Sequence, residues 1–225
     1  MKSTVSSAKK LAFQQKLLAW YPKGRRTFSW RNGKRNAYQI LIAEIMLRKT
    51  DTLKVSRVYD SFLAKYSDPQ SLMKAKESAV LKKIRLLGIA DRARLLKLLA
   101  RDLIERHSGR VPRDFDALVR LPGVGPYIAN AVLCFAYRQD VPLVDTNVIR
   151  LLDRVFSVRS STPRARNDLR LWEFAASLVP GKKATSYNRA LLDHAALLCT
   201  YREPRCEACP LNAVCDFYAA RCSEL

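Results

Sequence analysis

Apolar residues recur at spacings of three and four along nearly the whole chain, which is the pattern of helices that bury one face. Helix-ending signals lie between these stretches: in "RHSGRVP", Gly109 follows a histidine of the expected last turn, and Pro112 comes shortly after. The stretches "SDPQSL" and "VPGKK" predict further breaks. No segment of useful length alternates as a half-buried strand would, so we predict an all-α protein. The expected helices cover residues 11–20, 38–47, 55–66, 95–104, 115–121, 128–136, 148–155, 169–178 and 190–198.

The chain is strongly basic. Its 225 residues include 41 lysines and arginines against 20 aspartates and glutamates, a formal net charge of +21. Such an excess favours a polyanionic partner, because each neutralised phosphate releases condensed counterions. A solvated basic surface on an enzyme with another kind of substrate is one alternative. An anionic membrane surface is another, but no isolated basic amphipathic helix supports it.

The N-terminal segment lacks the uninterrupted apolar stretch of a secretory signal. The longest uncharged run, residues 121–137, is short for a bilayer crossing and is interrupted by prolines and glycines. We therefore expect an intracellular, soluble protein with no membrane segment. In that setting, its six cysteines are expected to be metal ligands or free thiols and not disulfides.

A glycine-rich turn, "LPGVGPYIANAV" from Leu121, joins two predicted helices. Pro126 suits the first position of the second helix, where an N–H would have no partner. Gly123 and Gly125 permit positive φ and carry no Cβ that would hold another molecule away. The backbone N–H groups around Val124, beside a helix N-terminus, would form a pocket for a nucleic-acid phosphate, a contact that reads no base sequence. A tight turn that only joins two packed helices is the alternative.

Four of the six cysteines form the pattern C-x6-C-x2-C-x5-C near the C-terminal end. Four thiolates so close together indicate a tetrathiolate metal site, and the chemistry alone leaves zinc open. Of the other two cysteines, Cys134 is expected in the core and Cys222 on the surface. The two histidines are isolated, and we assign neither a role. The four predicted ligands are Cys199, Cys206, Cys209 and Cys215.

The glycine-rich turn and a second segment, "VDTNVIRLL" from Val144, resemble the endonuclease III superfamily of DNA glycosylases, the helix-hairpin-helix (HhH-GPD) superfamily. The patterns L-P-G-V-G and V-D-x-N-V-x-R carry the resemblance, which extends over about residues 28–215. It implies a two-lobed, all-α helix-hairpin-helix glycosylase fold with a C-terminal iron–sulfur cluster loop. It also implies a six-helix domain at residues 28–138, a discontinuous helical cluster domain at 1–27 and 139–225, and an active cleft between them.

The same resemblance implies a [4Fe–4S] cluster on the four cysteines, with the structural role of clamping a basic loop against DNA. The implied partner is double-stranded DNA with a mismatched or damaged base, bound by a monomer. Basic residues on and near the loop would face the DNA, namely Lys182, Lys183, Arg202 and Arg205.

Three residues would carry the chemistry. In a glycosylase, positive charge builds on the sugar as the base departs, and the resemblance gives the stabilising carboxylate to Asp145, which would also orient the attacking water. An aspartate before T-N-V-I-R-L-L also looks like a helix N-cap, and the two roles are compatible. Tyr127 stands where bifunctional members have a lysine that attacks the sugar. A phenol cannot form a Schiff base, so we expect a monofunctional enzyme that leaves an abasic site.

Glu44 is the only acid in the apolar segment "YQILIAEIMLRKT". Burial would favour its protonated form, which could hydrogen-bond to a flipped base or protonate it. The position resembles the acid of adenine glycosylases and of thymine glycosylases that act on G:T mismatches. The alternative is an exposed Glu44–Arg48 ion pair at i,i+4.

The identity of the excised base is predicted from differences between subgroups of the superfamily. Adenine glycosylases carry Gln-Gln-Thr where this chain has Arg48-Lys49-Thr50, and they have a further domain, whereas this sequence ends ten residues after Cys215. We therefore expect excision of thymine, and also uracil, opposite guanine. Arg48 and Lys49 would lie near the gap or the estranged guanine, and Leu87 or Ile89 would wedge into the base stack. Adenine excision opposite 8-oxoguanine and a non-catalytic iron–sulfur DNA-binding protein are the alternatives.

Overall fold

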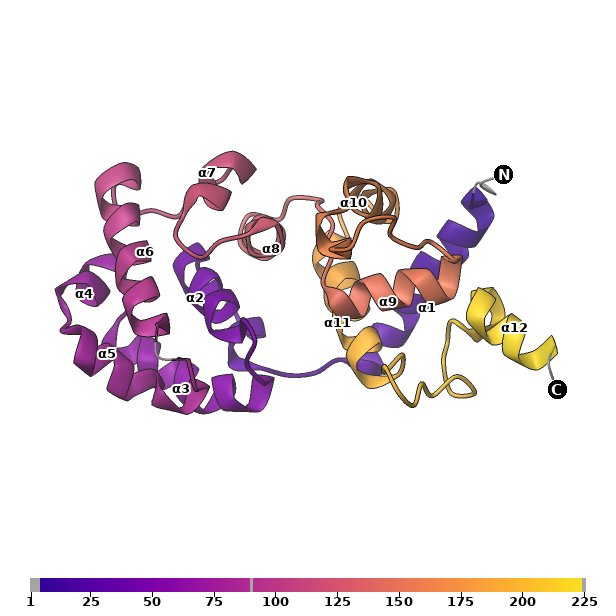
Figure 1. The fold of residues 1–225 in the computed structure, drawn as a ribbon, viewed down its shortest axis with the longest axis horizontal. Helices are drawn as coiled ribbons and strands as arrows, with labels where there is room; N and C mark the ends of the chain where they lie inside the picture. Colours follow the sequence, from indigo (N-terminus) through magenta and orange to yellow (C-terminus); the bar gives the residue numbers. More distant parts are fainter. Residues whose placement is uncertain (1–4, 90, 224–225) are drawn as a thin grey trace. The chain divides into compact units, whose positions relative to one another are not determined.

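The computed structural model describes residues 5–89 and 91–223. These segments are helical and contain no β-strand, which confirms the all-α prediction (Figure 1). The helices are α1 (Ser7–Gly24), α2 (Ala37–Leu47), α3 (Thr52–Lys65), α4 (Pro69–Lys74), α5 (Glu77–Ile84), α6 (Arg92–His107), α7 (Phe115–Arg120), α8 (Pro126–Phe135), α9 (Thr146–Phe156), α10 (Leu169–Ala176), α11 (Ala184–Leu197) and α12 (Asp216–Ser223), with short 3-10 turns η1 (Ser29–Arg31), η2 (Arg85–Leu87), η3 (Ala165–Asn167) and η4 (Asn212–Val214).

Local side chains fix many helix ends. Aspartate side chains accept backbone hydrogen bonds at the starts of five helices, and each satisfies an amide that the helix itself leaves unpaired. The predicted end of α6 is confirmed: Ser108 and Gly109 both have left-handed backbone, with φ of 52° and 74°, and Gly109 N donates to Leu103 O. The capping aspartates are Asp51, Asp68, Asp114, Asp145 and Asp168.

Three short helices were not predicted. The break predicted at "SDPQSL" is present at residues 66–68, but the stretch then continues as the start of α4, where Asp68 forms a capping box with Ser71 and Pro69 is the first helical residue. Helices α4 and α5 each bury only two side chains, and α12 buries none.

Residues 27–137 form one compact unit that contains α2 to α8. Helix α2 is its core helix, with Leu41, Ile42, Ile45 and Met46 fully buried. It packs against α3 and α8, while α4 and α5 pack against α6. The unit therefore places the Glu44 helix directly against the second hairpin helix.

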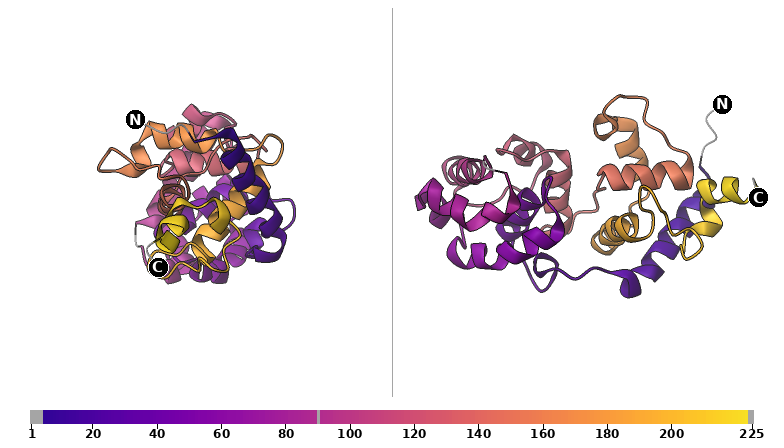
Figure 2. Two further views of the ribbon diagram at one scale, coloured as in Figure 1. Left: turned by 90° about the vertical axis from the view of Figure 1, so that its right-hand side faces the viewer. Right: turned by 60° about the horizontal axis from the view of Figure 1, so that its bottom comes forward.

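The second unit joins the segment up to Arg26 to the segment from Arg138 onward. Helix α1 lies beside α11, although the two are far apart in sequence (Figures 1 and 2). The Phe13 ring lies 5.0 Å from the Phe156 ring, edge to face, so α1 also contacts α9. Arg26 Nε donates to the fully buried Asp193 carboxylate over 2.7 Å. These contacts hold the N-terminal helix against the cysteine-bearing half of the chain.

Within the described residues, no helix combines the length and the apolar character that a bilayer span requires.

Candidate functional site

The hairpin between α7 and α8 needs one of its glycines for its own fold. Gly123 has φ of +79°, and a Cβ there would lie 2.7 Å from a methyl group of Leu95 and 2.9 Å from the Arg48 guanidinium. Val124 anchors the turn with a side chain that is only 6% exposed, and its N–H donates to Leu121 O. Glycine is therefore required at position 123 for two reasons: the backbone is left-handed, and the neighbouring side chains leave no room for a Cβ.

The other glycine has no such role inside the chain. Gly125 is the N-cap of α8, with extended backbone at φ −105° and ψ −179°. A Cβ added there would meet nothing within 4 Å. Any residue could adopt this backbone, so packing within the unit does not require glycine at this position. The missing side chain leaves the N-terminus of a ten-residue helix open to the close approach of an anion.

The predicted acid of α2 is buried. Glu44 is 7% exposed, so the alternative of an exposed Glu44–Arg48 pair is wrong. Arg48 reaches another partner: its Nη1 donates to Gly123 O over 2.9 Å and braces the hairpin turn. We expected Arg48 and Lys49 near an estranged guanine; Lys49 is exposed, in left-handed backbone with φ of 51°. The tertiary structure thus gives Arg48 a hairpin contact that its position in the sequence did not indicate.

Tyr127 is the second residue of α8 and is partly exposed. It follows the open glycine of the hairpin by two positions. Because α2 packs against α8, Tyr127 and Glu44 belong to neighbouring helices of the same unit. A phenol and a carboxyl group therefore lie on these two neighbouring helices, and Tyr127 carries no amine for covalent attack.

Asp145 is the N-cap of α9, as its sequence context suggested. Its Oδ1 accepts from Val148 N over 2.7 Å, and Asn147 Nδ2 lies 3.5 Å from its Oδ2. Asn147 is held in turn by Arg150, whose Nη1 donates to Asn147 Oδ1 over 2.9 Å. The Asp145 side chain stays partly exposed, so the carboxylate is both fixed in orientation and reachable.

Helix α9 connects this carboxylate to the cysteine loop. Arg150 donates to Cys199 O over 2.9 Å and to Ala195 O over 2.7 Å. One turn later, Arg154 Nη1 lies 3.3 Å from Cys199 Sγ and 2.6 Å from Thr200 O. Two arginines of the helix that Asp145 caps thus hold the segment that leads into the first cysteine.

The structure brings the four predicted cysteine ligands to the lining of one cavity. Arg154, Arg205 and His194 also line the cavity. Burial raises the pKa of Cys209 to about 11, and the neighbouring cysteines contribute to the rise. Burial likewise raises the pKa of Cys215. These thiols would ionise only where a metal compensates the buried charge.

Within residues 5–89 and 91–223, no group of three or more His, Cys, Asp or Glu side chains is arranged so that it could hold a metal ion. A mononuclear zinc site needs four sulfurs at about 2.3 Å from one centre. The donor set is all sulfur, and arginine N–H groups face two of its members: Arg154 reaches Cys199, and Arg221 Nη1 lies 3.9 Å from Cys206 Sγ. The arginines would offset part of the negative charge of thiolates at these two positions.

One residue near the cysteines was missed. His194 is fully buried, and its Nε2 lies 3.2 Å from Cys209 Sγ. Burial lowers the pKa of His194 to about 4, so the ring is neutral near pH 7. No spacing rule marks a histidine five residues before Cys199, and only the packing of α11 reveals it. The two remaining cysteines lie as expected, with Cys134 buried and Cys222 exposed.

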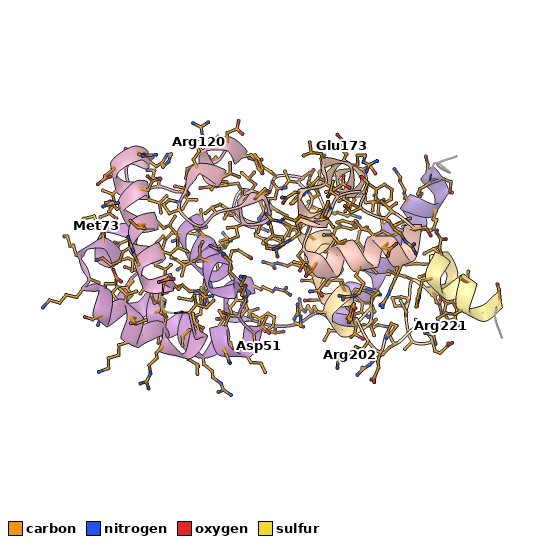
Figure 3. The ribbon with its side chains drawn as sticks, viewed as in Figure 1. Asp51, Met73, Arg120, Glu173, Arg202 and Arg221 are labelled. Carbon is orange, nitrogen blue, oxygen red and sulfur yellow. The ribbon has the colours of Figure 1, made fainter. Side chains whose placement is uncertain are left out.

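The wedge prediction needs a correction. Leu87 is only 4% exposed, because η2 turns its side chain into the unit, whereas Ile89 is 36% exposed. Leu87 is therefore not available to enter a base stack in this conformation, and the exposed Leu86 was not considered. The predicted basic contacts are all exposed, and the Arg202 side chain is visible in Figure 3. They are Lys182, Lys183, Arg202 and Arg205.

Comparison with known proteins agrees with the resemblance to DNA glycosylases that the sequence motifs indicated. Residues 42–174 match the family described as HhH-GPD superfamily base excision DNA repair protein. The chain is 38% identical over 219 residues to a thymine/uracil-DNA glycosylase of Methanothermobacter thermautotrophicus, covering 97% of this chain and 98% of that protein. It is 41% identical over 211 residues to a thymine-DNA glycosylase of Aeropyrum pernix, covering 92% and 94%.

The fold matches as well. The solved structure of a thermostable thymine-DNA glycosylase superposes with a TM-score of 0.88 at 37% identity, covering 95% of this chain and 98% of that one.

Proposed function

Because the chain belongs to the HhH-GPD superfamily of base excision DNA repair proteins, we propose that it is a monofunctional DNA glycosylase that removes thymine or uracil mispaired with guanine. The product is an abasic site in an unbroken strand. The observation that carries the proposal is the identity of about 40% to thymine and thymine/uracil glycosylases over nearly the full length of both chains. The tyrosine at position 127 further supports base release without strand cleavage.

In this proposal, Asp145 stabilises the sugar cation that develops as the glycosidic bond breaks. The Val148 N–H and Asn147 hold the carboxylate in one orientation, which spares reorganisation during the reaction. The same carboxylate orients the water that adds to the sugar carbon. A fixed anion near the reacting sugar contributes most in the transition state, where the positive charge is largest.

Glu44 and Tyr127 act on the base side in the proposal. A carboxyl group buried in α2 can donate a hydrogen bond to the departing base, which needs a proton as it leaves. Tyr127 contributes a hydroxyl and apolar ring surface for an extruded nucleotide. A base in a G:T or G:U mispair costs less to unstack than a paired base, which favours its extrusion.

The hairpin would hold the DNA backbone. The open N-terminus of α8 at Gly125 suits a phosphate, and the contact is independent of base sequence. Lys49 and the exposed basic residues Lys182, Lys183, Arg202 and Arg205 would add further backbone contacts. Ile89 is the proposed wedge, because its side chain is exposed and that of Leu87 is not. The proposed partner is double-stranded DNA, bound by one copy of the chain.

We also propose that Cys199, Cys206, Cys209 and Cys215 hold a [4Fe–4S] cluster. The four cysteines that line one cavity and the nearby arginines support a tetrathiolate site, and the resemblance of the cysteine spacing to the endonuclease III cluster loop favours iron–sulfur over zinc. When bound, the cluster would supply four metal–thiolate bonds that close the loop, with no step of base excision assigned to it. Arg154 and His194 would donate N–H groups to the ligand sulfurs Cys199 and Cys209, respectively.

The proposal is tested with end-labelled duplexes that contain G:T, G:U, 8-oxoguanine:A or only matched pairs. Single-turnover reactions are divided, and one half is heated in alkali, which cleaves at abasic sites. We expect strand breaks from G:T and G:U, only after alkali. Breaks only from the 8-oxoguanine:A duplex would replace thymine with adenine as the substrate. Tight binding to every duplex without any base release would show a non-catalytic protein.

A further inference from the structure

Arg92, the first residue of α6, is a buried cation without an acidic partner. It is 3% exposed, and none of the ion pairs among the described residues includes it. Burial, together with the positive charge of Arg48, lowers its pKa. A buried charge is costly unless it is paired or well hydrogen-bonded. Burial of the Arg92 charge is therefore unfavourable by itself. The hydrogen bonds of the guanidinium must offset this cost.

Those hydrogen bonds hold the loop between α2 and α3. Arg92 Nη2 donates to Arg48 O over 2.5 Å, and Nη1 donates to the Thr50 hydroxyl over 2.9 Å. The two acceptors flank Lys49, whose left-handed backbone is unusual for a residue with a side chain. A planar guanidinium can reach both acceptors at once, whereas a lysine ammonium is a single point of contact.

The held loop connects to two other segments. The Thr50 hydroxyl, which accepts from Arg92, lies 3.4 Å from Leu87 O and can donate to it. Arg48 Nη1 donates to Gly123 O in the hairpin turn. Arg92 also holds the segment before it, since its backbone N–H donates to Ile89 O over 3.2 Å. We call this set, Arg48, Thr50, Leu87, Arg92 and Gly123, the Arg92 junction.

We propose that Arg92 is a positioning residue that makes the hairpin turn, Lys49 and the turn before Ile89 one rigid DNA-facing surface. The identity of the ligand, a DNA duplex, rests on the function proposed above. A phosphate held at the hairpin fixes the distance to an extruded nucleotide only if the intervening loop cannot move. Rigid support of this kind affects the rate of the chemical step more than the affinity for DNA, because catalysis is the more sensitive to small displacements.

The test compares Arg92→Met with Arg94→Met. Both remove one positive charge from the first turns of α6, but Arg94 is exposed and has no hydrogen bond or ion pair with the residues of the junction. We expect Arg92→Met to slow single-turnover excision from a G:T duplex by about 10- to 100-fold. Affinity for an undamaged duplex should stay within about threefold, because the hairpin amides remain, and Arg94→Met should match wild type in rate. Arg92→Lys should recover part of the lost rate, since it restores one donor.

Two further readouts separate positioning from general stability. With 2-aminopurine beside the mispaired thymine, Arg92→Met should reduce the fluorescence rise that accompanies base extrusion. Hydrogen-exchange mass spectrometry without DNA should show faster amide exchange in residues 48–50 and 85–89, with α3 unchanged. This exchange measurement needs no catalytic activity, so it still decides the role of Arg92 if the wild-type protein releases no base.

Thr50→Val keeps the test decisive if Arg92→Met fails to fold. It removes one acceptor of Arg92 with little change in volume, and it should give the same exchange pattern and a smaller rate loss. Thr50→Val combined with Arg92→Lys should be less damaging than the sum of the two, because the variants share one hydrogen bond. The proposal would be overturned if Arg92→Met and Thr50→Val both showed the amide exchange of wild type and the excision rate of Arg94→Met.

Discussion

Val148 N donates to Asp145 Oδ1 over 2.7 Å, so the carboxylate that we propose as catalytic also caps its own helix. Its second oxygen faces Asn147 Nδ2 at 3.5 Å. The cap needs only a side-chain oxygen, whereas stabilisation of a sugar cation needs a negative charge. The two roles of Asp145 can therefore be separated by substitution.

Asp145→Asn should keep the cap and remove the charge. We expect base excision to slow by about 100-fold or more, with melting temperature and duplex affinity close to wild type. Asp145→Ala should lose the same activity and also about 1 kcal/mol of stability, because alanine cannot cap. Asp114→Asn is the matched control, since Asp114 caps α7 by accepting from Ala117 N over 2.8 Å. An active Asp145→Asn enzyme would contradict the assignment.

Tyr127→Lys tests the absence of an amine at the start of α8. If the lysine reaches the sugar, it can form a Schiff base there, and borohydride should then trap a covalent protein–DNA complex. Tyr127→Phe should release the base and give no trapped complex, because it keeps the ring and adds no nucleophile. Borohydride trapping of the wild-type enzyme would show a nucleophile elsewhere and would contradict the monofunctional proposal.

Alanine substitutions at the two hairpin glycines should affect different properties: stability at Gly123 and DNA affinity at Gly125. Gly123→Ala should destabilise the fold by at least about 1–2 kcal/mol, because its backbone is left-handed and its Cβ would strike Leu95. Gly125→Ala should change stability by less than about 1 kcal/mol, since a weaker cap and a less flexible unfolded chain offset each other. Its DNA affinity should nevertheless fall about tenfold or more, because the new methyl group obstructs a phosphate. If a binding titration gave Gly125→Ala and wild type the same affinity for DNA, the proposed contact between the hairpin and a phosphate would be contradicted.

The cysteine site can be tested without DNA. The purified protein should absorb broadly at about 400 nm and contain iron and acid-labile sulfide in equal amounts. Cys206→Ser should lose the absorbance and much of the stability of the loop, because a thiolate ligand is gone. Cys222→Ser should change neither, since Cys222 is exposed and lies outside the cavity. Stoichiometric zinc without sulfide would contradict the cluster.

The sequence by itself determined the features that depend on a few neighbouring residues. The helix start at Asp145 was predicted from its neighbours because a cap and the first turn of its helix lie within a few residues. The all-α class followed from apolar periodicity over most of the chain, and the cysteine spacing named residues that do line one cavity. The short helices α4, α5 and α12 were not predicted, and each contributes at most two buried side chains to the fold.

Only the tertiary structure decided the features that depend on distant segments. It turned Arg48 toward Gly123, buried Leu87, and set His194 beside Cys209. It also distinguished Gly123, which packing requires, from Gly125, whose missing side chain no neighbour explains. The physical reason is the range of the forces involved. Caps and turns are satisfied within a few residues, whereas burial and side-chain direction are set by whichever helices the folded chain brings together.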